Sequence, residues 1–590
     1  MLLSRLVDYG ERLARESDSP PLPPGYQEVP IRWLIHLDKD GKVTRSASRT
    51  SDEKTQGDRA KLFRAPSLVR AAGVKAKLLA DNAEYTLGIP RLGADTEKVA
   101  NRHEAYKKAV RTCAEATKIP EVQAVQRFLE DPDIAGLRLP DGFDSADNLT
   151  FVVNGTLPID RPDVRRYWAK AGRRTGKGNK KVLVAECLIS GETGEVMDRE
   201  PVKIKGIPGG QTSGMNLISA NEAVYESYGL SASQIAPVLP EYAEKYANAL
   251  NQLLKDRQTH LRIGRTVVYV FWTRHGAIPP IPDLLANPGG ESAELHALFA
   301  GEQSGGPAQA TARADQVRKS LESVWSGRSF ESMRDNAFYA AALSASGGRV
   351  IVRDHIETTI SRLRVNLREY FRSQALIDTD GRPGEPLGLF ALSAGLYRDA
   401  NKEMVPAVPV AIVKFALQLS PLPYTLLDQL VKRNRAERRV TRPRALLTKM
   451  VLASSKEDMA GMDSLVRDRV EAAYQLGRLL AALDSLQYAA LGKVNATIVD
   501  RYYGSFGTAP ASVFGRLMQS SQDYLGKIRK TKPGAYVSVQ KRLQEIISRI
   551  SDVPDTLGTR DQALFSLGYY HERADYWAAL NERLEQEGEE

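Results

Sequence analysis

An apolar seam between residues 462 and 490 is the feature that most constrains the fold of this chain. Its members recur at a spacing of seven and then at alternating spacings of four and three: Leu465, Ala472, Leu476, Leu479, Leu483, Leu486 and Ala490. Such a repeat places an apolar stripe along a helix, and that stripe must be buried against other helices. Residues 510–528 and 560–584 repeat the pattern. The C-terminal part is therefore predicted to be a helical bundle.

The first 400 residues show strand patterns as well as helical ones. Two hairpins are expected, one from residues 31–37 and 43–48, the other from residues 181–190 and 196–206. Residues 266–273 predict a buried strand, residues 349–371 a strand leading into a helix, and residues 104–117 and 242–254 two further helices. The predicted fold class is α+β, with a mixed α/β N-terminal portion followed by an all-helical C-terminal bundle.

A chain of 590 residues is too long for one ordinary core. Three regions are predicted: a mixed α/β domain over residues 1–215, a central α/β region over 216–400 and the bundle over 401–590. Residues 278–312 are rich in Pro, Gly, Ser and Ala, which predicts a flexible insertion. The two cysteines, Cys113 and Cys187, support no disulfide framework, and no segment has the pattern of a signal peptide or membrane span. We expect a cytoplasmic protein with no membrane contact.

The stretch NEAVYESYGLS at residues 221–231 is dense in polar and aromatic groups. Ser219 and Glu222 have the spacing of a capping box, although Asn221 alone would also cap a helix. Val224, Tyr225 and Tyr228 would then share one face of a helix of about two turns that ends at Gly229. This stretch is therefore predicted to be architecture rather than a catalytic pocket.

Positive charge is concentrated in two short windows. Residues 165–181 carry eight basic side chains and no acid: Arg165, Arg166, Lys170, Arg173, Arg174, Lys177, Lys180 and Lys181. Residues 432–450 carry eight against Glu437: Lys432, Arg433, Arg435, Arg438, Arg439, Arg442, Arg444 and Lys449. Clustered cations suit a polyanion because each neutralised phosphate releases condensed counterions. Solvated faces remain the alternative, and Tyr167 and Trp168 can either stack on bases or anchor a helix.

Signals for catalysis are sparse. The seven histidines show no metal-ligand spacing, and AGRRTGKG lacks two residues of a phosphate-binding loop, because Ala171 and Gly178 stand where glycine and a hydroxyl are needed. We therefore expect no cofactor, no metal and no chemistry of the chain's own. The alternative is a nuclease or guide-RNA-processing enzyme whose site is assembled from the distant residues Asp354, His355 and His571.

Several stretches, taken in order, resemble the large subunit of the type I-C CRISPR surveillance complex, the Cascade of that subtype. The longest is SGMNLISANEAVYESYGLSASQIAPVLPEYAEKYANALNQLL; the others are LVDYGERL, KLLADNAEYTLGI, SGGRVIVRDHIET, LLDQLVKRNR and FSLGYYHERADYW. Departures from the family pattern occur at Ala220, Tyr225, Ile235, Asp354 and His355.

The resemblance implies an RNA-guided, DNA-binding antiviral assembly in which other subunits carry the guide RNA. This chain would read a protospacer-adjacent motif in duplex DNA, hold the displaced strand in an R-loop and help recruit a helicase-nuclease. A separate small subunit matching the C-terminal region is a further possible partner. For motif readout we expect Lys75 and Lys77 on phosphates and Asn82 on a base edge, unless Asn82 caps a turn. A scaffold that binds only RNA or partner subunits remains an alternative.

Overall fold

The computed structural model describes residues 1–16, 22–23, 25–50, 60–68, 70, 74–131, 137, 139–172, 183–220, 222–276, 278–288, 336–459 and 461–588. The chain forms two compact units. The N-terminal unit comprises Met1–Lys205 and Thr212–Gln252, and the C-terminal unit comprises Gly206–Gln211 and Leu253–Glu590. The predicted boundaries near residues 215 and 400 stay predictions.

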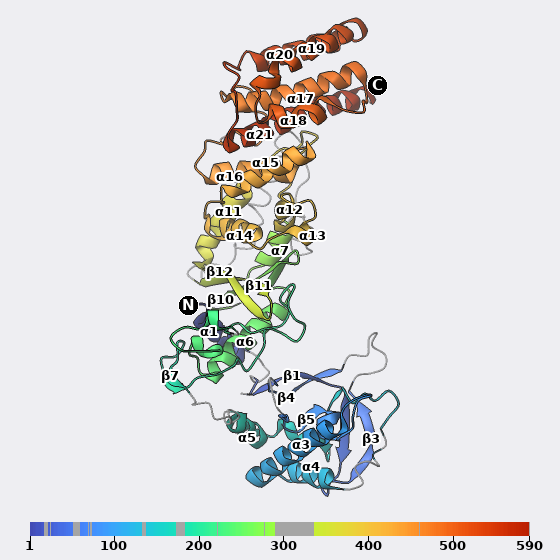
Figure 1. Cartoon of the computed structure of the whole chain (residues 1–590), viewed down its shortest axis with the longest axis vertical. Coiled ribbons are helices and arrows are strands. Elements are labelled where there is room, and N and C mark those ends of the chain that lie inside the picture. Colours follow the sequence, from blue (N-terminus) through green and yellow to red (C-terminus); the bar gives the residue numbers. More distant parts are fainter. Residues whose placement is uncertain are drawn as a thin grey trace. The chain divides into compact units, whose positions relative to one another are not determined.

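A four-stranded sheet with the order β3-β2-β6-β5 organises the N-terminal unit (Figure 1). Its strands are β2 (Trp33–Leu37), β3 (Val43–Arg49), β5 (Ala80–Asn82) and β6 (Asn148–Val153). The predicted first hairpin is confirmed, since β2 and β3 pair antiparallel, and β6 joins β2 in parallel. Helices α3 (Thr96–Thr117) and α4 (Pro120–Glu130) share a core with this sheet, in which Trp33 and Phe151 are fully buried.

The remaining elements of this unit border that core or follow it in the chain. A two-stranded ribbon pairs β1 (Tyr26–Ile31) with β4 (Lys61–Pro66), and Ala83–Thr86 (α2) and Pro162–Gly172 (α5) are helical. The expected helices at 104–117 and 242–254 are confirmed as parts of α3 and of α6 (Pro240–Lys255). The second predicted hairpin is only a short pair, β7 (Val184–Glu186) with β8 (Thr193–Glu195). Its second strand lies in the predicted turn, so residues 196–206 were wrongly assigned.

The prediction of a two-turn helix that ends at Gly229 is also wrong. Only one 3-10 turn forms, at Ala223–Tyr225, and Ser227 pairs with Leu230 across a tight turn. The backbones of Ala220 and Ala232 pair as well, which closes this segment into a loop. Val224 and Tyr228 are exposed, so these two members of the predicted apolar face are not buried. Without such burial, a two-turn helix has little to stabilise it.

An antiparallel sheet with the order β12-β11-β10-β9 begins the C-terminal unit. Its strands are β9 (His260–Ile263), β10 (Val267–Thr273), β11 (Ala337–Ser346) and β12 (Arg349–Thr359). The strand predicted at 266–273 is confirmed, as is the passage from β12 into α11 (Ile360–Ser373). Within the predicted flexible insertion, residues 281–286 form helix α7 instead, because Ile281, Leu284 and Leu285 are buried in the core. Residues 289–312 lie outside the described residues.

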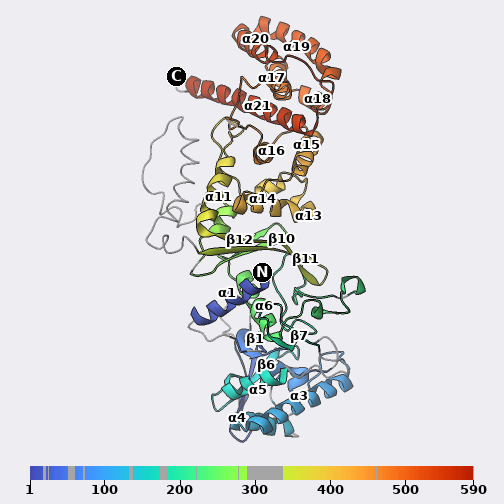
Figure 2. The same cartoon turned by 90° about the vertical axis from the view of Figure 1, so that its left-hand side faces the viewer.

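Helices follow the sheet in successive layers (Figures 1 and 2). Helices α11, α12 (Leu389–Ala394) and α14 (Ala407–Gln418) pack nearest the strands, with the short α13 (Ala400–Glu403) beside them, and α15 (Thr425–Glu437) and α16 (Arg442–Ser454) come next. The last layer holds α17 (Ala472–Leu491), α18 (Ile498–Phe506), α19 (Ala511–Thr531), α20 (Pro533–Ile547) and α21 (Thr559–Gly588). The predicted all-helical C-terminal bundle is confirmed. None of the described helices is long and apolar enough to cross a membrane.

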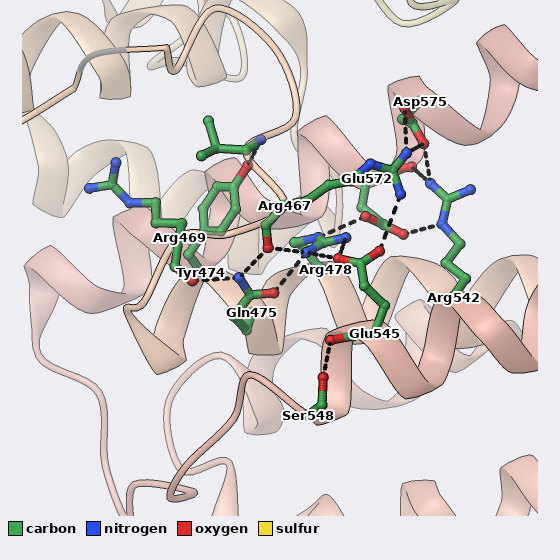
Figure 3. Close-up of polar contacts among 11 residues, drawn as sticks. Arg467, Arg469, Tyr474, Gln475, Arg478, Arg542, Glu545, Ser548, Glu572 and Asp575 are labelled. Carbon is green, nitrogen blue, oxygen red and sulfur yellow. Dashed lines mark hydrogen bonds and ion pairs between the residues drawn. The ribbon is translucent and has the colours of Figure 1, made fainter.

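The helix predicted over the apolar seam at residues 462–490 begins at Ala472, ten residues after the predicted start. The preceding segment instead folds over the start of α17, where Gln475 donates to the carbonyl oxygens of Arg467 and Arg469 at 3.2 and 2.6 Å. Beneath it lies a network of charged side chains (Figure 3). Arg478 on α17 is fully buried and lies 2.9 Å from Glu572 on α21 and 3.1 Å from Glu545 on α20. These ion pairs hold three helices together.

Candidate nucleic-acid interface

The first basic window begins on α5, and its described part is held by local ion pairs. Arg165 lies 2.7 Å from Asp160, and Arg166 pairs with Asp163. Lys170 is exposed and pairs with no described carboxylate. Trp168 is buried, and its Nε1 donates to the carbonyl oxygen of Gly25 at 2.9 Å, so it anchors the helix rather than offering a stacking surface. Arg173, Arg174, Lys177, Lys180 and Lys181 lie outside the described residues.

The second basic window splits into two groups, and the first of them is structural. Arg444 is buried; its Nε donates to the carbonyl oxygen of Gly395 at 2.8 Å, and its guanidinium pairs with Glu437. Arg433 pairs with the same carboxylate. Arg442 donates to the carbonyl oxygen of Glu385 at 2.5 Å, and burial lowers its pKa. These three arginines, together with the buried Lys449, which pairs with Asp463, stabilise the fold, and their side chains are poorly placed for phosphate.

The second group is exposed: Lys432, Arg435, Arg438 and Arg439. Lys432 and Arg435 lie one turn apart on α15, and Arg438 and Arg439 follow at its C-terminal end. No described carboxylate lies within ion-pair distance of Lys432, Arg435 or Arg439. Cations at a helix C-terminus are stabilised by the helix dipole, which is a structural reason for their presence. Their exposure nevertheless leaves them available to a polyanion.

The loop expected to read the DNA motif is built around a buried carboxylate. Asp81 accepts hydrogen bonds from the guanidinium of Arg70 and from the backbone N–H groups of Lys77 and Asn82, the last two at 3.0 and 2.9 Å. Arg70 also donates to the carbonyl oxygen of Lys75 at 2.7 Å and lies 3.8 Å from the ring centre of Tyr85. The backbone of residues 75–82 is therefore held in one conformation.

Cations gather at this loop. Burial lowers the pKa of Lys77, Asp81 opposes this, and the positive charges of Arg70 and Lys205 lower it further. The positive charges of Arg70 and Lys205 thus act on the Lys77 ammonium, and a phosphate oxygen placed beside these cations would relieve their mutual repulsion. Lys75 is half-buried on the same loop.

Asn82 is engaged as a helix cap. Its Oδ1 accepts from the backbone N–H of Tyr85 at 3.3 Å, which makes it the N-cap of α2. This is the alternative that the sequence left open. Base readout by Asn82 stays a prediction, and it would have to use the amide nitrogen or break the cap.

A further basic surface, outside both charge windows, lies at the connection between α19 and α20. Residues 527–532, KIRKTK, carry four basic side chains and no acid. Lys527, Arg529 and Lys530 are exposed, and Nζ of Lys532 donates to the carbonyl oxygen of Ala489 at 3.1 Å. This contact brings the connection beside the end of α17, where Tyr488 is 53% exposed. Four basic side chains within six residues are the signal of this surface in the sequence.

The residues of the enzyme alternative are not brought together. Asp354 and His355 are neighbours on β12, and Asp354 lies 3.6 Å from Lys414 on α14. His571 is buried in the bundle on α21, with its Nδ1 2.9 Å from the hydroxyl of Tyr474. Among the described residues, no cluster of His, Cys, Asp and Glu is suited to hold a metal ion.

Comparison with known families agrees with the resemblance seen in the sequence. A family model described as CRISPR-associated protein (Cas_Csd1) matches residues 6–577, which is nearly the whole chain. No curated protein sequence matches it. The predicted family resemblance is confirmed by this match.

Proposed function

This chain belongs to the CRISPR-associated Cas_Csd1 family, and from that premise we propose that it is the DNA-recognition subunit of a type I-C CRISPR surveillance complex. A guide RNA carried by other subunits reads sequence by base pairing, while this chain reads the adjacent motif in duplex DNA. It also stabilises the R-loop, holds the displaced strand and helps recruit a helicase-nuclease. It carries out no chemistry of its own.

The cation cluster at the loop of residues 75–82 carries this proposal. Arg70 and Lys77 lie around Asp81 on a backbone held by hydrogen bonds, and Lys205 adds a third positive charge. Readout of a short motif needs such a rigid support, because phosphate contacts set the register in which a side chain meets a base edge. The exposed cations of α15 and of residues 527–530 supply further surface for the displaced single strand.

The test compares target duplexes that differ only in the adjacent motif, using the assembled complex. We expect the wild-type complex to prefer the motif-bearing duplex. Lys77→Ala weakens binding to both duplexes, since a phosphate contact carries no sequence information, whereas Asn82→Ala reduces the preference between them. Lys108→Ala, at an exposed lysine on α3, is the matched control and leaves both affinities unchanged.

Two outcomes contradict the proposal. A complex indifferent to the motif would indicate a scaffold that binds only RNA or partner subunits. Cleavage of DNA or guide precursor that follows the purified chain would indicate an enzyme.

A further inference from the structure

An exposed loop at residues 222–230 presents large apolar side chains to solvent. Val224 is 78% exposed and Tyr228 is 99% exposed. The loop begins and ends at a backbone pair, in which the N–H of Ala220 donates to the carbonyl oxygen of Ala232 at 2.9 Å. Large apolar groups gathered at one exposed place usually indicate an interaction site.

The base of this loop is fixed by hydrogen bonds. The backbone N–H of Leu217 donates to the buried carboxylate of Glu200 at 2.5 Å, and the hydroxyl of Tyr246 on α6 donates to the same group. Ser233 Oγ donates to the carbonyl oxygen of Ile218 at 2.7 Å. The loop is therefore presented from a rigid support, which lowers the entropic penalty of binding.

Folding alone does not explain a tyrosine at the tip. The N–H of Leu230 donates to the carbonyl oxygen of Ser227 at 2.9 Å, and Tyr228 and Gly229 have φ values of 54° and 69°. Two left-handed residues in succession form a type I′ turn, where asparagine, aspartate or glycine is favoured over an aromatic residue. Tyr228 is thus both strained and solvated, so its ring serves contact rather than folding.

Charge indicates the class of partner. Residues 215–239 contain Glu222 and Glu226 and no lysine or arginine, although the chain as a whole carries a net charge of +10. Two exposed carboxylates in the same loop disfavour a phosphate backbone and favour a positively charged protein surface. We propose that this loop docks a neighbouring protein subunit of the complex, with Tyr228 in an apolar pocket and Glu222 and Glu226 facing a basic rim.

This inference depends on the proposed function only in requiring that the chain works within a multi-subunit complex. The first experiment places the photo-crosslinking residue p-benzoylphenylalanine at position 228 of the full chain, assembled with its partner subunits and guide RNA. The same residue at position 92 is the matched control, since Leu92 is fully exposed in the same unit. We expect a crosslink to one protein subunit from position 228 and none from position 92.

A crosslink to RNA, to DNA or to a second copy of this chain would overturn the inference, and so would a yield no greater than that of the control. Motif-dependent DNA binding, measured on the same samples, reports on the proposed function separately. A complex that prefers its motif but gives no protein crosslink from position 228 would contradict only this inference. A complex that gives the crosslink but shows no motif preference would contradict only the proposed function.

The second experiment measures the affinity of the full chain for the remaining subunits. Tyr228→Asn keeps a residue that suits the turn, so it removes the ring without straining the loop. We expect affinity to fall by about 30-fold, as for loss of an interface hot spot, while Tyr228→Phe retains most of it. Equal affinity of the Asn variant and the wild type would show that the ring makes no contact.

Discussion

Two buried titratable residues make the stability of this protein depend on pH in opposite directions. Glu200 joins α6 to the segment before the exposed loop, and His571 lies in the bundle against Tyr474. Burial disfavours the charged form of each, which raises the pKa of the acid and lowers that of the base. Both effects are properties of single side chains, so single substitutions should reveal them.

Glu200→Gln tests the first effect. Burial raises the pKa of Glu200 from 4.5 to about 7 despite the hydrogen bonds from Tyr246 and Leu217. The folded state therefore binds a proton more tightly than the unfolded state. The protonated carboxyl adds to the free energy of unfolding below pH 4.5, and this contribution is lost as pH rises through 7. The full effect is roughly 3 kcal/mol. Urea unfolding at pH 5, 6, 7 and 8 should show this decline in the wild type and a flatter profile in Glu200→Gln.

Glu195→Gln, at an exposed carboxylate of β8, is the control for that series. It should follow the wild-type profile. An equally steep decline in Glu200→Gln would mean that Glu200 is charged in the folded protein.

His571→Asn tests the opposite effect. Burial, followed by the charges of Lys449 and Arg469, lowers the pKa of His571 from 6.5 to about 3. The neutral imidazole therefore contributes to the free energy of unfolding above pH 6.5, and this contribution is lost as pH falls toward 3. About 2 kcal/mol of it is lost between pH 6.5 and pH 5. We expect the loss of stability between pH 7 and pH 5 to shrink by that amount in His571→Asn. His275→Asn, at an exposed histidine, is the control and should leave the loss of stability between pH 7 and pH 5 unaltered. An NMR signal from a charged His571 imidazolium at pH 5 would refute this prediction.

At the scale of elements, the bundle depends on a close crossing of α17 and α21. A Cβ at Gly568 would lie 2.0 Å from the carbonyl oxygen of Tyr474, and one at Gly477 would lie 2.0 Å from that of Phe565. Backbone therefore meets backbone on both sides of the crossing, close to the ion pair of Arg478 with Glu572. A side chain at either glycine must push the helices apart.

Gly568→Ala should therefore destabilise the protein by roughly 3 kcal/mol, as expected for severe overpacking. Gly526→Ala on α19 is the matched control, because a Cβ there meets no atom within 4 Å. The control should gain about 0.5–1 kcal/mol, since alanine favours the helix over glycine. Thermal unfolding of both variants measures the contrast, and two shifts of the same sign would mean that the crossing tolerates a side chain.

Some helices and strands could be predicted from the sequence and others could not. Apolar periodicity found the bundle and β10, because burial of a stripe or of a whole strand leaves a regular pattern. The start of α17 and the loop at residues 222–230 depend instead on individual hydrogen bonds that leave no periodic pattern. Examples are the bond from the Gln475 side chain to the carbonyl oxygen of Arg467 and the backbone pair of Ala220 with Ala232. Charge windows likewise located arginines without separating the buried Arg444 from the exposed Arg435.

For the whole molecule, the eight basic side chains of each charge window overstate the charge available to DNA. Arg165 and Arg166 are neutralised by carboxylates on or beside α5, and Arg433 and Arg444 share Glu437. Among the described residues of the second window and of the α19–α20 connection, exposed cations lie on and just after α15 and at residues 527–530. Affinity for nucleic acid should therefore depend on a subset of the basic residues. The slope of log K against log salt measures how many of them contact phosphates.

The triple variant Lys432→Gln, Arg435→Gln, Arg439→Gln tests that count in the assembled complex. Each contact to a single-strand phosphate contributes about 0.7 to the slope of log K against log salt, so losing three should lower the slope by about 2. Arg372→Gln is the control: this exposed arginine on α11 lies 3.8 Å from Glu369, and its loss should leave the slope unchanged. An unchanged slope in a folded triple variant would exclude α15 from the path of the strand and leave residues 527–530 as the surface to test next. A slope lowered equally by both variants would instead indicate a diffuse field with no defined path.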